Sequence, residues 1–77
     1  MKPDEQQLLI RMLRDRPGLG AAPTCTATEL AAKLSMNEKR AEYLLGKWTD
    51  KGWWDYGVSL RTGWLTEKGL EEARKQA

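Results

Sequence analysis

Histidine and phenylalanine are absent from this chain, and cysteine occurs only once, as Cys25. Without histidine, the chain lacks the side chain that most often serves as a proton shuttle and metal ligand. A lone cysteine excludes an internal disulfide framework and is typical of a reducing compartment. Carboxylates do not cluster at metal-ligand spacing, and Gly18 and Gly20 are not followed by the Gly-Lys-Ser/Thr of a phosphate-binding loop. We therefore expect no enzymatic activity, no metal and no cofactor.

Long hydrophobic runs are lacking as well. No apolar stretch approaches the ~20 residues that a membrane-spanning helix needs. Acidic residues follow the N-terminal methionine too early for a secretory signal peptide. The sequence therefore predicts a cytoplasmic protein with no membrane partner.

The length and the aromatic content together describe the expected core. A chain of 77 residues predicts a single domain, 1–77, whose small core a homodimer interface would help to stabilise. Large rings that each bury about 150–250 Å² should fill much of that core. The chain has four of them, Trp48, Trp53, Trp54 and Trp64. The 13 basic and 11 acidic residues leave a formal net charge of +2, which is compatible with nucleic acid as a partner but does not require it.

The first part of the chain has the pattern of an amphipathic helix over residues 4–16. Pro3 and Asp4 suit its first turn. Its apolar positions recur with a period near 3.6 and are Leu8, Leu9, Met12 and Leu13. The composition of residues 17–25, PGLGAAPTC, then predicts a loop.

The middle of the chain predicts two helices joined by a short turn. Thr26 and Glu29 have the spacing of a capping box, which predicts a helix over 27–35 with Leu30, Ala31 and Leu34 facing inward. Asn37 is a good N-cap for a helix over 37–51, and Gly52 suits its end.

Beyond this helix the hydrophobic period changes from 3.6 to 2. Trp54, Tyr56 and Val58 alternate with polar residues and glycine, which is a strand signal. A loop at 57–60 would return the chain into a second strand at 61–66, so residues 53–66 should form a hairpin. Thr66 can then cap a final helix over 67–75.

This order of elements resembles the winged helix-turn-helix family of bacterial and phage DNA-binding regulators. The resemblance covers residues 4–70 and rests on ELAAKL, SMN, EKRAEYLLGKW, DKGWW and WLTEKG. It implies a mainly α fold with a small β-hairpin, built as a three-helix core, a two-stranded wing and a short C-terminal helix. It also implies binding to double-stranded DNA, with helix 37–51 in the major groove and the wing on the DNA backbone. The modest charge and the tryptophan-rich hairpin depart from the family's pattern.

Gly46 lies inside helix 37–51, where a glycine costs about 1 kcal/mol relative to alanine. At 100° per residue, one face of this helix gathers Ala41, Leu44, Leu45 and Trp48, and Gly46 lies on the opposite, outward face. A glycine there removes bulk where a DNA backbone could approach the helix closely. The alternatives are contact with another protein segment and a plain solvated face.

The resemblance and this helical geometry together predict a DNA-binding surface. Arg and Lys can reach the O6 and N7 atoms of guanine, Lys47 is better placed for a phosphate, and Arg61 and Thr62 match the wing tip. Asn37 has a competing role as the N-cap, and Arg40 has one in a surface ion pair. The predicted DNA-binding residues are Asn37, Lys39, Arg40, Tyr43, Gly46, Lys47, Arg61 and Thr62.

Two functions follow from this surface. The first is a DNA-binding module, either a small regulator of transcription or an accessory factor of a phage or mobile element. The second is a winged-helix module for protein–protein interaction without direct DNA binding, which docks through the outward helix face or the tryptophan hairpin. The outward Lys39, Arg40, Lys47 and Arg61 favour the first function, which is the one we expect. The near-balanced charge, with Glu38 and Glu42 on the outward helix, favours the second.

Overall fold

The computed structural model of the chain describes residues 1–15 and 26–77. The loop predicted at 17–25 lies outside the described residues, as does the last residue of the predicted first helix. The helices are α1 (Pro3–Asp15), α2 (Ala27–Lys33), α3 (Glu38–Asp50) and α4 (Glu67–Gln76). The strands are β1 (Trp54–Asp55) and β2 (Trp64–Leu65), with a 3₁₀ turn, η1 (Leu60–Thr62), between them. A mainly helical chain with one small antiparallel hairpin is thereby confirmed.

Three helices begin at the predicted capping residues. The side-chain oxygen of Thr26 accepts a hydrogen bond from the backbone N–H of Glu29, at 3.2 Å. Asn37 accepts one from Lys39 N–H, at 2.7 Å, and Thr66 accepts one from the third residue of α4. These bonds satisfy N–H groups that have no partner within the first turn of a helix. The capping role of Asn37 is therefore confirmed.

The second helix ends two residues earlier than predicted. Leu34 N–H and Ser35 N–H already donate to carbonyls only three residues back, and Ser35 adopts a left-handed conformation with a φ of 61°. Met36 N–H then donates to the carbonyl of Ala31, at 3.0 Å, which closes the helix end. This left-handed residue turns the chain sharply, so the link from α2 to α3 is residues 34–37.

The strands of the hairpin are shorter than predicted. Only Trp54↔Leu65 and Asp55↔Trp64 pair across it. The predicted alternation through residue 58 does not form a strand, because Val58 is 96% exposed and has no core to face. The chain returns through η1, so the second strand contains two residues of the predicted 61–66. A β-carbon at Gly63 would collide with the carbonyl oxygen of Asp55 and with the ring of Trp54, which is why a glycine closes this hairpin.

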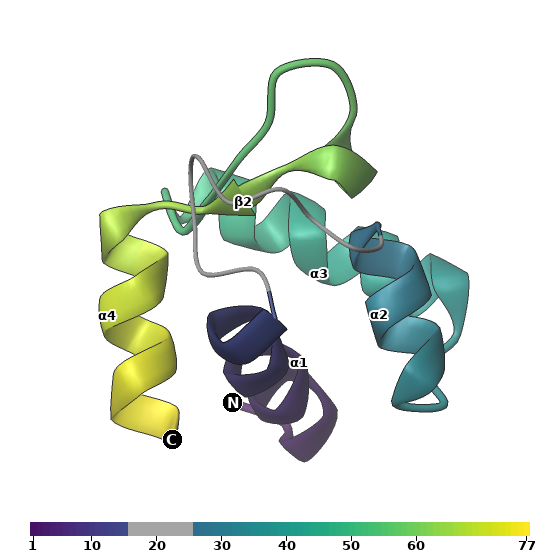
Figure 1. Cartoon of the computed structure of the whole chain (residues 1–77), viewed down its shortest axis with the longest axis horizontal. Coiled ribbons are helices and arrows are strands. Elements are labelled where there is room, and N and C mark those ends of the chain that lie inside the picture. Colours follow the sequence, from purple (N-terminus) through teal and green to yellow (C-terminus); the bar gives the residue numbers. More distant parts are fainter. Residues whose placement is uncertain (16–25) are drawn as a thin grey trace.

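The core lies between the helices and the base of the hairpin. In Figure 1, α1 lies between α2 and α4, and α3 passes behind them with the hairpin packed against it. The predicted inward face of α3 is confirmed, because all four of its apolar residues are fully buried. Trp48 meets Trp54 with ring centroids 6.1 Å apart, whereas Trp53 and Trp64 are only half-buried. The buried apolar residues are Leu8, Leu9, Met12, Ala27, Leu30, Ala31, Ala41, Leu44, Leu45, Trp48, Trp54, Leu65 and Ala73.

Candidate functional site

The outward surface of α3 carries two neighbouring rows of side chains with opposite charge. Residues four apart on a helix lie next to one another, so each row follows the helix from one end to the other. The first, which we name the acidic row, contains Glu38, Glu42, Gly46 and Asp50. The second, the basic row, contains Lys39, Tyr43, Lys47 and Lys51, the last of these being the C-cap residue.

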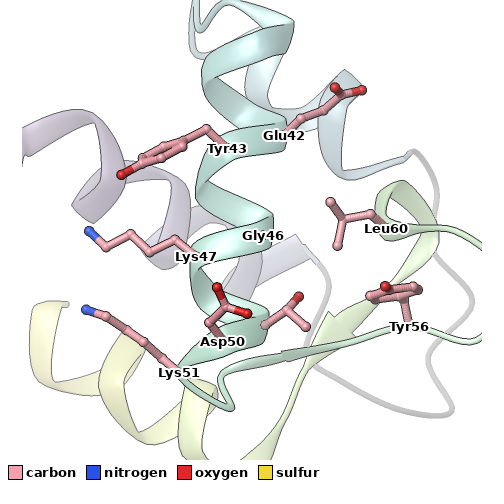
Figure 2. A pocket seen from close by; sticks show the side chains of 9 residues that line it. Glu42, Tyr43, Gly46, Lys47, Asp50, Lys51, Tyr56 and Leu60 are labelled. Carbon is pink, nitrogen blue, oxygen red and sulfur yellow. The ribbon is translucent and has the colours of Figure 1, made fainter.

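A groove with a volume of about 670 Å³ lies along these rows and reaches the hairpin. Figure 2 shows Leu60 and Tyr56 on the hairpin side, whereas Lys47 and Lys51 point away from them, past the other side of α3. We name this space the hairpin groove. It is lined by Glu42, Tyr43, Gly46, Lys47, Thr49, Asp50, Lys51, Tyr56 and Leu60.

Gly46 lies in the middle of the groove's helical side (Figure 2), on the predicted outward face. A β-carbon added to Gly46 would find no atom within 4 Å. Packing within the described chain therefore does not require a glycine here. Its effect is to keep the centre of the hairpin groove free of a side chain.

Arg40 forms an ion pair with the first turn of α1, as one of its two predicted roles required. Its Nε and Nη2 donate to the two carboxylate oxygens of Asp4 at 2.9 and 3.2 Å. This two-bond geometry lowers the pKa of Asp4 and raises the pKa of Arg40. The guanidinium also lies 5.5 Å from the ring centre of Tyr43. Arg40 is therefore held beside the basic row and does not extend freely from it.

Lys47, predicted to contact a phosphate, is bound instead to a buried carboxylate. Its Nζ donates to Glu5 at 3.0 Å, and the indole N–H of Trp48 donates to the other oxygen of the same carboxylate at 2.8 Å. The Glu5 side chain is only 2% exposed. Burial by itself would raise the pKa of Glu5, but the hydrogen bonds from Trp48 and Lys47 outweigh it, so the pKa lies below its usual value.

Glu5 is a residue of this site that the sequence pattern alone did not single out. The interpretation of the first turn used Asp4 as a helix-start residue and did not place Glu5 on the buried face. The signal was nevertheless present, because Glu5 lies three and four residues before the apolar Leu8 and Leu9 and so continues their stripe. A carboxylate at such a position needs a buried partner, and α3 supplies two.

Arg61 does not project from the hairpin as a wing-tip contact would. Its Nη2 donates to Glu42 at 2.8 Å and lies 2.9 Å from the carboxylate of Glu38, so η1 is linked back to the acidic row. The hydrogen bond to Glu42, followed by the charges of Glu38 and Glu42, raises the pKa of Arg61. Thr62 is also engaged locally, because its hydroxyl donates to the backbone carbonyl of Ser59 at 3.1 Å.

The eight predicted residues therefore divide by their surroundings. Tyr43, Gly46 and Lys47 line the hairpin groove, and Lys39 begins the basic row. Within residues 1–15 and 26–77, no ion pair or side-chain hydrogen bond holds the ammonium of Lys39. The four others, Asn37, Arg40, Arg61 and Thr62, are used for capping, ion pairs and turn bonds.

In the part of the chain that the structure describes, no group of three potential metal ligands comes together. None of the helices described there is long and apolar enough to cross a bilayer. When the chain is compared with protein-family models, characterised proteins and solved structures, nothing matches it.

Proposed function

We propose that this chain is a small double-stranded-DNA-binding module of the winged helix-turn-helix type, acting as a transcriptional regulator or as an accessory factor of a phage or mobile element. The observation that carries the proposal is the position of Lys39 and Tyr43. These side chains are exposed one turn apart in the first half of α3, which follows α2 after a short turn and precedes the hairpin. A helix about 10–12 Å across fits the major groove, which is about 12 Å wide.

In this mode the base contacts come from the start of the basic row. Lys39 has a free ammonium among the described residues and can donate to O6 or N7 of a guanine. Tyr43 is 61% exposed and can reach a phosphate or a base edge. Asn37 contributes the helix cap and no base contact, because its side-chain oxygen already accepts from Lys39 N–H.

Phosphate contacts require that existing ion pairs exchange. Arg61 can exchange its carboxylate partners for a phosphate at little cost, because solvent-exposed pairs contribute little stability. Lys47 is a poorer candidate, because its departure would leave the buried Glu5 with a single hydrogen bond. We therefore expect few phosphate contacts and a shallow salt dependence of binding. The logarithm of the binding constant should fall by about 0.9 per tenfold rise in salt concentration for each phosphate neutralised.

The test is a titration of the full chain with a pool of mixed-sequence duplexes, read by amide chemical shifts at low and at physiological salt. The shifts should change along α3 from Lys39 to Gly46, and Lys39→Ala should weaken binding by an amount that depends on the duplex sequence. The matched control is Lys75→Ala, which removes the same charge from an exposed position on α4. An absence of shift changes with the parent chain, or equal losses in both variants, would refute the proposal.

A further inference from the structure

We propose that the hairpin groove docks a segment of a partner protein that carries an apolar side chain flanked by lysine or arginine. The groove is lined by Tyr43, Lys47 and Lys51 of the basic row but not by Lys39. Docking there would recruit another protein. The proposal combines the shape of the groove, its charge and two locally unfavourable residues in the acidic row.

The space and its apolar wall suit one or two large side chains. The groove's volume of about 670 Å³ falls within the ~300–1,000 Å³ range of ligand pockets. Leu60 and Tyr56 form the wall opposite Gly46, and Tyr56 is 42% exposed. Because Gly46 has no side chain, an incoming residue can reach the backbone of α3 between these walls.

The charges around the groove favour a cationic partner over a nucleic acid. Glu38, Glu42 and Asp50 follow α3, and the exposed Asp55 lies on the hairpin. Arg61 forms ion pairs with Glu38 and Glu42, whereas no ion pair within residues 1–15 and 26–77 holds the carboxylate of Asp50 or of Asp55. The groove's two lysines point to the other side of the helix (Figure 2). One is held by Glu5, and the other lies 4.5 Å from the ring centre of Trp53. The carboxylate of Asp50, which has no ion-pair partner among the described residues, therefore attracts Lys or Arg and disfavours a phosphate.

Two residues of the acidic row weaken α3 without any benefit inside the described chain. Gly46 lowers helix propensity although a side chain would fit. Asp50 places a carboxylate at the C-terminal end of the helix, where the helix dipole disfavours negative charge. No ion pair within residues 1–15 and 26–77 compensates Asp50. Residues that lower the local stability of a helix without a compensating contact are typical of functional surfaces. A docked segment accounts for both of them, with its apolar side chain at Gly46 and its cation at Asp50.

The experiment selects binders to the full chain from a displayed library of random peptides, and then titrates the synthetic selected peptides. We expect enrichment of leucine or aromatic residues next to lysine or arginine, with amide shifts at Gly46, Asp50 and Tyr56. Asp50→Lys should weaken binding roughly tenfold, because charge reversal replaces an attraction with a repulsion. Gly46→Gln should also abolish most binding, because its side chain fills the groove. Both variants should fold, since a β-carbon at Gly46 meets no atom within 4 Å, Asp50 is exposed, and a lysine near the C-terminal end of α3 does not oppose the helix dipole.

The matched control is Glu71→Lys, which makes the same charge reversal at an exposed position on α4 and should leave peptide affinity unchanged. Selection of acidic or uncharged peptides, or unchanged affinity in Asp50→Lys, would overturn the proposal. A dimer in sedimentation that Asp50→Lys dissociates would also overturn it, because the occupant would then be a second copy of the chain. Two variants allow peptide docking and DNA binding to be tested independently. Lys39→Ala should leave peptide affinity unchanged, and Asp50→Lys should not weaken duplex binding.

Discussion

Glu5→Gln tests whether the buried carboxylate joins α1 to α3. In the parent chain, the two oxygens of Glu5 accept from the Lys47 ammonium at 3.0 Å and from the Trp48 indole at 2.8 Å. The glutamine amide has almost the same shape, but it has one acceptor oxygen and presents an NH₂ group where the second acceptor stood. One donor therefore loses its partner inside the protein, and the charge that attracted Lys47 disappears.

The magnitude follows from the burial of the two partners. A hydrogen bond to a charged group contributes about 1.5–3 kcal/mol, and breaking a fully buried ion pair costs about 3–5 kcal/mol. The Lys47 side chain is 34% exposed, so its ammonium recovers hydration in the variant. The variant also avoids burying a charge, which offsets part of the loss. We therefore expect the free energy of unfolding to fall by about 2 kcal/mol, and the melting temperature by about 8–16 °C.

Urea unfolding followed by tryptophan fluorescence measures this change, since Trp48 is one of the groups affected. The matched control is Glu71→Gln, which removes an exposed carboxylate on α4 and should lie within about 0.5 kcal/mol of the parent. Adding Lys47→Met gives a double-mutant cycle, in which the two losses should sum to more than the loss in the double variant. A Glu5→Gln variant as stable as its control, or strictly additive losses, would show that this contact does not link the helices.

The remaining predictions concern stability. Gly46→Gln should raise the free energy of unfolding by up to about 1 kcal/mol, because it relieves the glycine penalty in open space; a thermal melt that falls would contradict this. Leu45→Ala, at a fully buried position, should lower the free energy of unfolding by about 2–5 kcal/mol. Leu34→Ala should lower it less, because Leu34 is only half-buried. If chemical denaturation gave the reverse order, the core would lie elsewhere. The pKa values of Asp4 and Glu5 are lowered in the folded chain, so their stabilisation is present above the ordinary values of 3.8 and 4.5 and is lost as the pH falls through the lower folded values. Urea midpoints should therefore fall on acidification below those ordinary values, and more gently in Glu5→Gln; identical acid profiles for parent and variant would refute that account.

Features that depend on a few neighbouring residues could be predicted from the sequence. The caps at Thr26, Asn37 and Thr66 are of this kind, because each bond spans only two or three residues. The buried face of α3 was also predictable, since helical periodicity places Trp48 and its neighbours without reference to the rest of the chain. Strand length was not predictable in this way. The alternation through Val58 looked like a strand, but a strand continues only where a partner strand and a core face exist.

The ion pairs of the site required the tertiary structure. Asp4 and Arg40 are 36 residues apart, so their meeting depends on how α1 packs over α3. Helical periodicity assigns each side chain to a face, but it does not say which face of another helix lies opposite. The same limit applies to Arg61, whose turn brings it back to the acidic row and not outward as a wing tip.

By itself, the sequence determined that Gly46 faces outward, because 100° per residue and the apolar stripe of α3 leave it no other direction. It also determined the two rows of charge, since residues four apart on a helix are neighbours. Only the tertiary structure decided that Gly46 lies in a groove. A groove needs a second wall, and that wall is Leu60 and Tyr56, which reach α3 because the short hairpin folds back along it. Local rules specify the surface of one helix, whereas the partner of that surface depends on contacts between segments that are distant in the chain.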